Sequence, residues 1–311
     1  MKYVKFGLHP LAEEHIVDRW TFERVTKSKH PWQMGIGDDK KEYAICPACN
    51  NPVRLFGLYK KMDKQPYGAH TGKTIEGSEP LLPKHNVENY EYCPLSRKGK
   101  RVGDKDARHS NPTDIQLAVY DILKNNFHKV VYVIERALKF KGSNAFWEKA
   151  LKSFIESKAY LYPWITIANC PWMLCFFGVN NLALYKQGIL INSSLYDCIE
   201  ENCKNARFIT INDEPELATL ENNGSFLDTV SFRFSSHNSH LEDDQNLIET
   251  IQWCINFGSK DPKEIFNRKI TVNQKSFKAI LGHKWQGIDA RWRHLCNMAE
   301  KLMPPLSQSV M

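Results

Sequence analysis

The sequence predicts an α+β fold in three parts, on the strength of three observations. Residues 1–110 are rich in proline, glycine, histidine and charge, and their apolar residues follow neither the helical nor the strand period, which predicts a small irregular module. Residues 111–160 follow the helical period, and the remainder alternates strand-like with helix-like segments. We therefore expect two domains: an N-terminal module over 1–110 and, over 111–311, a helix-rich middle leading into a mixed α/β body.

Helices are predicted in the segment that begins at residue 111. Thr113 and Asp114 can cap the first helix, because short polar side chains accept hydrogen bonds from free amides at a helix start. Apolar residues then recur on one side of each segment. The three predicted helices cover residues 114–123, 130–138 and 144–160.

The run over residues 159–185 has no charged side chain and is long enough to cross a bilayer if it formed one helix. Pro171 would break such a helix, and the asparagines in the run would be costly in hydrocarbon. We therefore expect a buried core segment and no membrane partner.

The C-terminal body is expected to mix strands with helices. Val230, Phe232 and Phe234 alternate with polar residues, as in a strand with one buried face. Strands are predicted over residues 188–192, 206–212, 228–234 and 268–273, and helices over 194–203, 243–257 and 287–303.

The nine cysteines form an odd, unevenly spaced set, and the first residues show no signal-peptide pattern. Both features favour reduced thiols or metal ligands over a disulfide framework. We therefore expect a cytoplasmic protein.

The stretch YGAHTGKTI, residues 67–75, nearly matches a phosphate-binding loop. Gly68 and Gly72 are one residue too close for that loop, and neither a buried strand nor a helix flanks it. The stretch is therefore expected to contribute His70 to another kind of site.

A set of cysteines and histidines surrounds this stretch, with the spacing C-x2-C-x20-H-x22-C. Two cysteines separated by two residues can place both thiolates on one metal ion, and a structural zinc site needs four ligands. The predicted zinc ligands are Cys46, Cys49, His70 and Cys93, with His85 as a rival to His70. Such a closed set leaves no position for a catalytic water, so a structural zinc is expected; the alternative is a set of merely buried thiols.

The layout CPAC, YGAH and YCPLS over residues 40–100 resembles the N-terminal zinc modules of uncharacterised bacterial proteins that accompany phage-defence and retron genes. It is also similar to modules of some competence-related DNA-processing proteins. The resemblance implies that Cys46, Cys49, His70 and Cys93 bind zinc, and it implies a setting in antiviral defence or a mobile element.

Positive charge is concentrated toward the N-terminus. Residues 1–110 contain 20 lysines and arginines against 14 acidic residues, whereas residues 201–311 contain 13 against 14. A basic run follows Cys93 and suits phosphate contacts on nucleic acid, although a solvated basic loop is the alternative. The predicted nucleic-acid-binding residues are Arg97, Lys98, Lys100, Arg101, Lys105 and Arg108.

A second polar cluster is expected in a loop of the C-terminal body. Histidines next to carboxylates can perform acid–base or metal-assisted hydrolysis, although a strand end followed by an acidic helix start is an equally simple interpretation. The candidate catalytic residues are His237, His240, Asp243 and Asp244.

These features predict a zinc-containing protein that binds nucleic acid or a nucleoprotein and serves as an accessory or effector in a bacterial defence or mobile-element system. The alternative is a toxin-like hydrolase that acts on nucleotides or nucleic acid through the candidate catalytic residues. A purely structural role is the third hypothesis.

Overall fold

The computed structural model contains helices and antiparallel sheets, which confirms the α+β class. It forms two compact units. The first comprises Met1–Ala107, Pro112–Ala118 and Asn238–Glu249, and the second comprises Arg108–Asn111, Val119–His237 and Thr250–Met311. The residues that the structure describes are 1–60, 65–96, 99–100, 102–204, 206–211, 213–222, 229–242, 246–258, 262–285 and 287–306.

The first unit contains a six-stranded antiparallel sheet where the sequence predicted an irregular module. Its strands run in the order β2-β1-β4-β5-β6, and β3 pairs with β4. Strands of two to five residues carry too few side chains for the two-residue period to stand out. The strands are β1 (Tyr3–Lys5), β2 (Glu14–Ile16), β3 (Gln33–Met34), β4 (Lys41–Ile45), β5 (Pro52–Phe56) and β6 (Tyr67–His70), and η1 (Gly37–Asp39) lies between β3 and β4.

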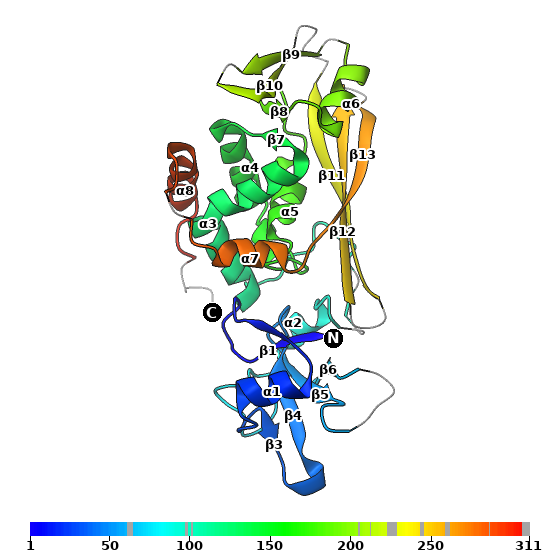
Figure 1. Ribbon diagram of the computed structural model, residues 1–311, viewed down its shortest axis with the longest axis vertical. Helices are drawn as coiled ribbons and strands as arrows, with labels where there is room; N and C mark the ends of the chain where they lie inside the picture. Colours follow the sequence, from blue (N-terminus) through cyan, green and yellow to red (C-terminus); the bar gives the residue numbers. More distant parts are fainter. Residues whose placement is uncertain are drawn as a thin grey trace. The chain divides into compact units, whose positions relative to one another are not determined.

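Helix α1 (Arg19–Thr26) packs on this sheet (Figure 1). Asp18 caps it by accepting a hydrogen bond from the amide of Thr21 at 2.8 Å. Phe22 is 1% exposed and joins the core formed with Val4 and Ile45. Burial of this aromatic side chain fixes which side of α1 faces the sheet.

The second unit is rich in helices, as predicted. Helix α3 (Asp114–Leu138) covers the first two predicted helices and bends at Asn126, whose φ and ψ of −132° and 27° are not helical. Helix α4 (Asn144–Glu156) is capped by Ser143, which accepts a hydrogen bond from the amide of Phe146. In Figure 1, α3 and α4 appear in green beside α5 (Cys170–Leu174).

Most of the uncharged run is buried, as expected from its prolines and asparagines, and Asn181 and Ala183 near its end are exposed. It contains η2 (Ala159–Leu161), α5 and the π-turn η3 (Cys175–Val179), and every residue of α5 and η3 is buried. In the described part of the chain, no helix has the length and apolarity needed to cross a membrane.

Two further antiparallel sheets are present, and each predicted strand overlaps one of their strands. One sheet has the order β7-β8-β10-β9, and the other has the order β11-β12-β13. Their strands are β7 (Phe140–Lys141), β8 (Gly188–Leu190), β9 (Ala206–Ile211), β10 (Glu214–Asn222), β11 (Val230–Glu242), β12 (Asn246–Phe257) and β13 (Lys263–Thr271). The helices α2 (Val87–Glu91), α6 (Ser194–Asn202), α7 (Ser276–Gly282) and α8 (Ala290–Leu302) complete the set of elements.

The prediction of a helix over residues 243–257 is wrong, because Asn246–Phe257 form strand β12. Isoleucine, threonine, tryptophan and phenylalanine are frequent in this segment, and such residues favour strands. Thr250 to Phe257 pair with β13 along its length. The helical spacing of apolar residues was therefore overridden by pairing with a neighbouring strand.

Helix α8 is held to the helical part of the second unit by a half-buried ion pair. Arg291 on α8 donates to both carboxylate oxygens of Glu135 on α3 and to the carbonyl oxygen of Gly142. The indole of Trp147 on α4 donates to the same carboxylate at 2.9 Å. One carboxylate thus joins three helices, and its charge is paired as burial requires.

A close approach of backbones at Gly178 gives the first prediction. A Cβ at this residue of η3 would collide with the carbonyl oxygen of Ala150 on α4. Gly178→Ala should therefore lower the free energy of unfolding by about 1–3 kcal/mol, measured by denaturant titration. Gly282→Ala is the matched control, since a Cβ there meets nothing within 4 Å. Equal stability of the two variants would contradict the prediction.

Candidate metal centre

Cys46 and Cys49 lie in the turn that joins β4 to β5. The amide of Asn50 donates to the carbonyl oxygen of Cys46 at 3.1 Å. The amide of Cys46 donates to the carbonyl oxygen of Asn51 at 2.9 Å. Asn50 adopts a left-handed conformation with φ of 57°, which asparagine tolerates better than most residues. These local bonds close the turn, as the C-x2-C spacing predicted.

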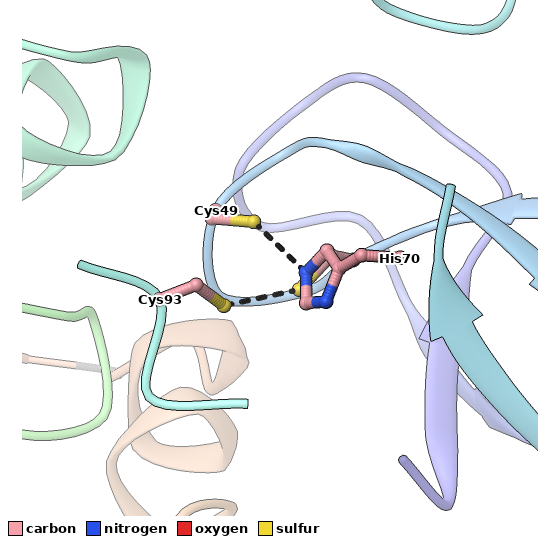
Figure 2. Close-up of side chains that lie close together, drawn as sticks. Cys49, His70 and Cys93 are labelled. Atoms are coloured by element: carbon pink, nitrogen blue, oxygen red, sulfur yellow. Dashed lines mark hydrogen bonds between the residues drawn. The ribbon is translucent and has the colours of Figure 1, made fainter. Parts of the chain in front are cut away.

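His70 is the last residue of β6, and strand pairing brings it to this turn. It lies opposite Val53 of β5 in the antiparallel register. Its Nε2 atom is 3.3 Å from the Sγ atom of Cys49. Figure 2 shows the imidazole ring directed toward the thiols.

Cys93 comes from a third segment, which follows α2. Its amide donates to the carbonyl oxygen of Tyr90, and its Sγ atom is 3.7 Å from that of Cys46. The four ligand atoms of Cys46, Cys49, His70 and Cys93 all lie within 4.8 Å of one another. Residues 47 positions apart in the chain therefore meet at one point.

The spacing of these atoms fits a tetrahedral metal ion. With Zn–S bonds of about 2.3 Å, two thiolates on one ion are about 3.8 Å apart, and a thiolate and an imidazole nitrogen are about 3.6 Å apart. The observed separations are 3.7 Å for Cys46 and Cys93 and 3.3 Å for Cys49 and His70. The cluster can therefore hold a metal ion with little movement.

Asn51 lies directly behind the ligands and is 1% exposed. Its Nδ2 atom donates to Sγ of Cys49 at 3.4 Å and to the carbonyl oxygen of Asn86 at 3.1 Å, while its Oδ1 accepts from the amide of Asn86 at 2.7 Å. Asn86 in turn caps α2 by accepting from the amide of Asn89. The turn and the helix that precedes Cys93 are thus joined by one amide side chain, a role that sequence spacing did not reveal.

The charges of the thiols also favour a bound cation. Burial raises the pKa of each thiol, but at Cys46 the hydrogen bonds with Cys49 and Cys93 and the effect of His70 outweigh it and lower the pKa well below its ordinary value. Burial and the neighbouring thiols hold the pKa values of Cys49 and Cys93 well above their ordinary value. A divalent cation would allow all three thiols to ionise together.

The structure favours His70 over His85 as the fourth candidate metal ligand. Within the described residues, His85 does not belong to the group of close ligand atoms. Its ring packs against Tyr90 at 5.5 Å between centroids, and burial lowers its pKa. His85 therefore lies near the site as a neutral neighbour.

The predicted nucleic-acid-binding residues are only partly described. Arg97, Lys98 and Arg101 lie outside the described residues. Lys100 forms an ion pair with Glu91 at 3.0 Å. Lys105 is exposed, and Arg108 donates to the carbonyl oxygen of Ser157 at 3.1 Å. Lys100 and Arg108 therefore contact groups of this chain.

The candidate catalytic histidines lie on strand β11, although the sequence predicted a loop. His237 is 5% exposed, and its Nδ1 atom is 3.1 Å from the hydroxyl of Tyr162. His240 is exposed, and residues three apart on a strand point to opposite faces. Asp243 and Asp244 lie outside the described residues, so the catalytic role of this cluster stays a prediction.

The position of His70 gives the second prediction. His70→Ala should weaken metal binding more than about a hundredfold, because loss of a direct ligand costs more than loss of a residue behind it. His85→Ala is the matched control and should keep the metal. Metal content by mass spectrometry and the thiolate absorption of the cobalt-substituted protein measure the difference. Loss of metal from the His85 variant alone would contradict the assignment.

The chain was compared with models of protein families, with curated proteins and with solved structures. None of the three comparisons finds a match. The resemblance over residues 40–100 therefore stays a prediction, and function is inferred from the side chains of this chain.

Proposed function

We propose that the first unit is a zinc-stabilised module that binds nucleic acid or a nucleoprotein. One observation carries the metal part of the proposal, namely that Cys46, Cys49, His70 and Cys93 place four ligand atoms within 4.8 Å of one another. Three thiolates and one imidazole are a donor set that zinc favours. Calcium and magnesium prefer oxygen ligands instead.

A structural role for the metal is supported by the closure of the site. The three cysteines are at most 4% exposed, and the four protein ligands fill a tetrahedral shell. A catalytic zinc keeps one position for water or substrate, so this donor set suits a fold-stabilising ion. The metal supplies a cross-link among three chain segments.

The nucleic-acid part of the proposal is supported by charge. Residues 1–110 contain six more cations than acidic residues, and the basic run over residues 97–108 begins four residues after Cys93. A polyanion gains affinity from such a region because its counterions are released. The likeness of the Cys and His layout to modules that accompany phage-defence genes favours an accessory role in a bacterial defence system.

Metal removal tests the structural role. A chelator should unfold the first unit and leave the second folded, because only the first contains the ligands. Hydrogen exchange measured by mass spectrometry should show fast exchange across β4, β5 and β6 with slow exchange retained in α3 and α4. Cys49→Ser should reproduce the effect, and Cys203→Ser, at another buried thiol, should not. Unchanged exchange in the metal-free protein would refute a structural metal.

Salt dependence tests the nucleic-acid role. Each phosphate contact on a single strand contributes about 0.7 to the slope of log affinity against log salt. The triple change Lys98→Ala, Lys100→Ala and Arg101→Ala should therefore lower the slope by up to about 2. The control is Lys149→Ala, Lys152→Ala and Lys301→Ala, which removes the same charge from helices of the second unit. Equal slopes in the two variants would contradict the proposal that the basic run contacts phosphates.

A further inference from the structure

The outer side of α1 displays an aromatic and basic surface, which we call the α1 surface. It consists of Arg19, Trp20, Arg24, Lys27 and Tyr59, all exposed to solvent. Trp20 is 68% exposed, although tryptophan is among the largest apolar side chains and is normally well buried. An indole with this exposure is available to a ligand, and tryptophan is among the residues enriched at binding hot spots.

The exposure of Trp20 follows from how α1 is anchored. Thr21, Phe22 and Thr26 face the sheet and are at most 7% exposed. Trp20 and Arg24 are four residues apart, so they lie together on the opposite side. The cap at Asp18 fixes the start of the helix. Trp20 is thus held outward by burial of its neighbours.

A cation lies against each of the two rings. The Arg24 guanidinium carbon is 4.8 Å from the centre of the Trp20 ring, and that of Arg19 is 5.0 Å from the centre of the Tyr59 ring. Each pair is a cation–π contact, which orients the ring and keeps a positive charge beside it. Arg24 lies over the indole, and 68% of the Trp20 residue is exposed to solvent.

The charge on this surface is positive and only partly paired. Arg19 forms an ion pair with Glu23 at 2.9 Å. Within the described part of the chain, Arg24 and Lys27 have no carboxylate at ion-pair distance. Lys27 follows the helix in a left-handed conformation, with its amide bonded to the carbonyl oxygen of Glu23. Among the described residues, Arg24, which lies over Trp20, and Lys27 at the end of α1 therefore have no acidic partner.

We infer that the α1 surface binds single-stranded nucleic acid, with one base stacked on Trp20 and phosphates on Arg24 and Lys27. A single strand offers free base faces, and aromatic rings next to cations are the elements that bind it. A duplex hides its base faces inside the helix, and an acidic peptide would pair with the cations without needing the indole. The inference rests on the proposed nucleic-acid role and assigns it a surface.

The test measures binding of the full metal-loaded chain to fluorescein-labelled oligothymidylate and oligouridylate by anisotropy. Trp20→Leu keeps an apolar side chain but removes the ring, and it should raise Kd roughly 5- to 100-fold. Trp20→Phe keeps a stacking ring and should restore most of the affinity. Leu81→Ala, at another exposed apolar residue of the first unit, is the matched control and should bind as the wild type does.

A charge variant tests the phosphate contact separately. Arg24→Gln should lower the slope of log affinity against log salt by about 0.7. Lys84→Gln removes the same charge from another exposed site in the first unit, and it should leave the slope unchanged. Metal content and circular dichroism of every variant verify that the first unit stays folded.

The outcomes separate the two proposals. If the wild type binds an oligonucleotide and the Trp20→Leu variant binds it equally well, the inference that the α1 surface binds nucleic acid is overturned. The nucleic-acid role of the first unit then stands. If the wild type binds neither oligonucleotide at low salt, the inference of single-strand binding is overturned, and binding to a labelled duplex then decides whether the nucleic-acid role stands. If the nuclease-treated chain instead retains a protein only when Trp20 is present, the surface is a protein-binding one and this inference is overturned.

Discussion

The first unit depends on the meeting of three thiols and one imidazole from three separate chain segments. These segments are the turn between β4 and β5, the end of β6 and the stretch after α2, and Cys46, Cys49 and Cys93 belong to the same buried core as Val4 and Ile45. The ligands are therefore part of the core, and the hydrogen bonds of Asn51 join the turn to the residue that caps α2.

Much of the helical part and the candidate metal ligands could be predicted from the sequence. Helices depend on the local spacing of apolar residues, and metal ligands belong to a few residue types at characteristic spacings. Apolar periodicity identified α4 and α8, and the C-x2-C spacing with the demand for four ligands identified Cys46, Cys49, His70 and Cys93. The strands of the first unit were missed because they are short. Strand β12 was mistaken for a helix because its pairing with β13 is a tertiary effect that apolar spacing does not record.

Charge shows a related limit of sequence reasoning. Composition places a cationic excess in residues 1–110, but it does not tell which cations are available to a ligand. Lys100 contacts Glu91, and Arg108 contacts a backbone carbonyl, whereas Arg24 lies beside an exposed tryptophan that no sequence motif singled out. An eight-residue helix is too short for its exposed side to be recognised by pattern alone, since the fold decides which side is buried.

The metal cluster and the α1 surface are linked through a shared core. Phe22, the residue that orients α1, is buried in the same apolar cluster that contains the three thiols. Trp32 and Tyr43 extend this cluster between the helix and the sheet. Loss of the metal would loosen the turn between β4 and β5, and with it the packing that holds Phe22 inward. Because Phe22 faces the core while Trp20 on the same helix faces solvent, the exposure of Trp20 and Arg24 belongs to the folded state that the proposed metal would stabilise. A metal ion with no catalytic position can in this way control binding at a surface formed by other residues.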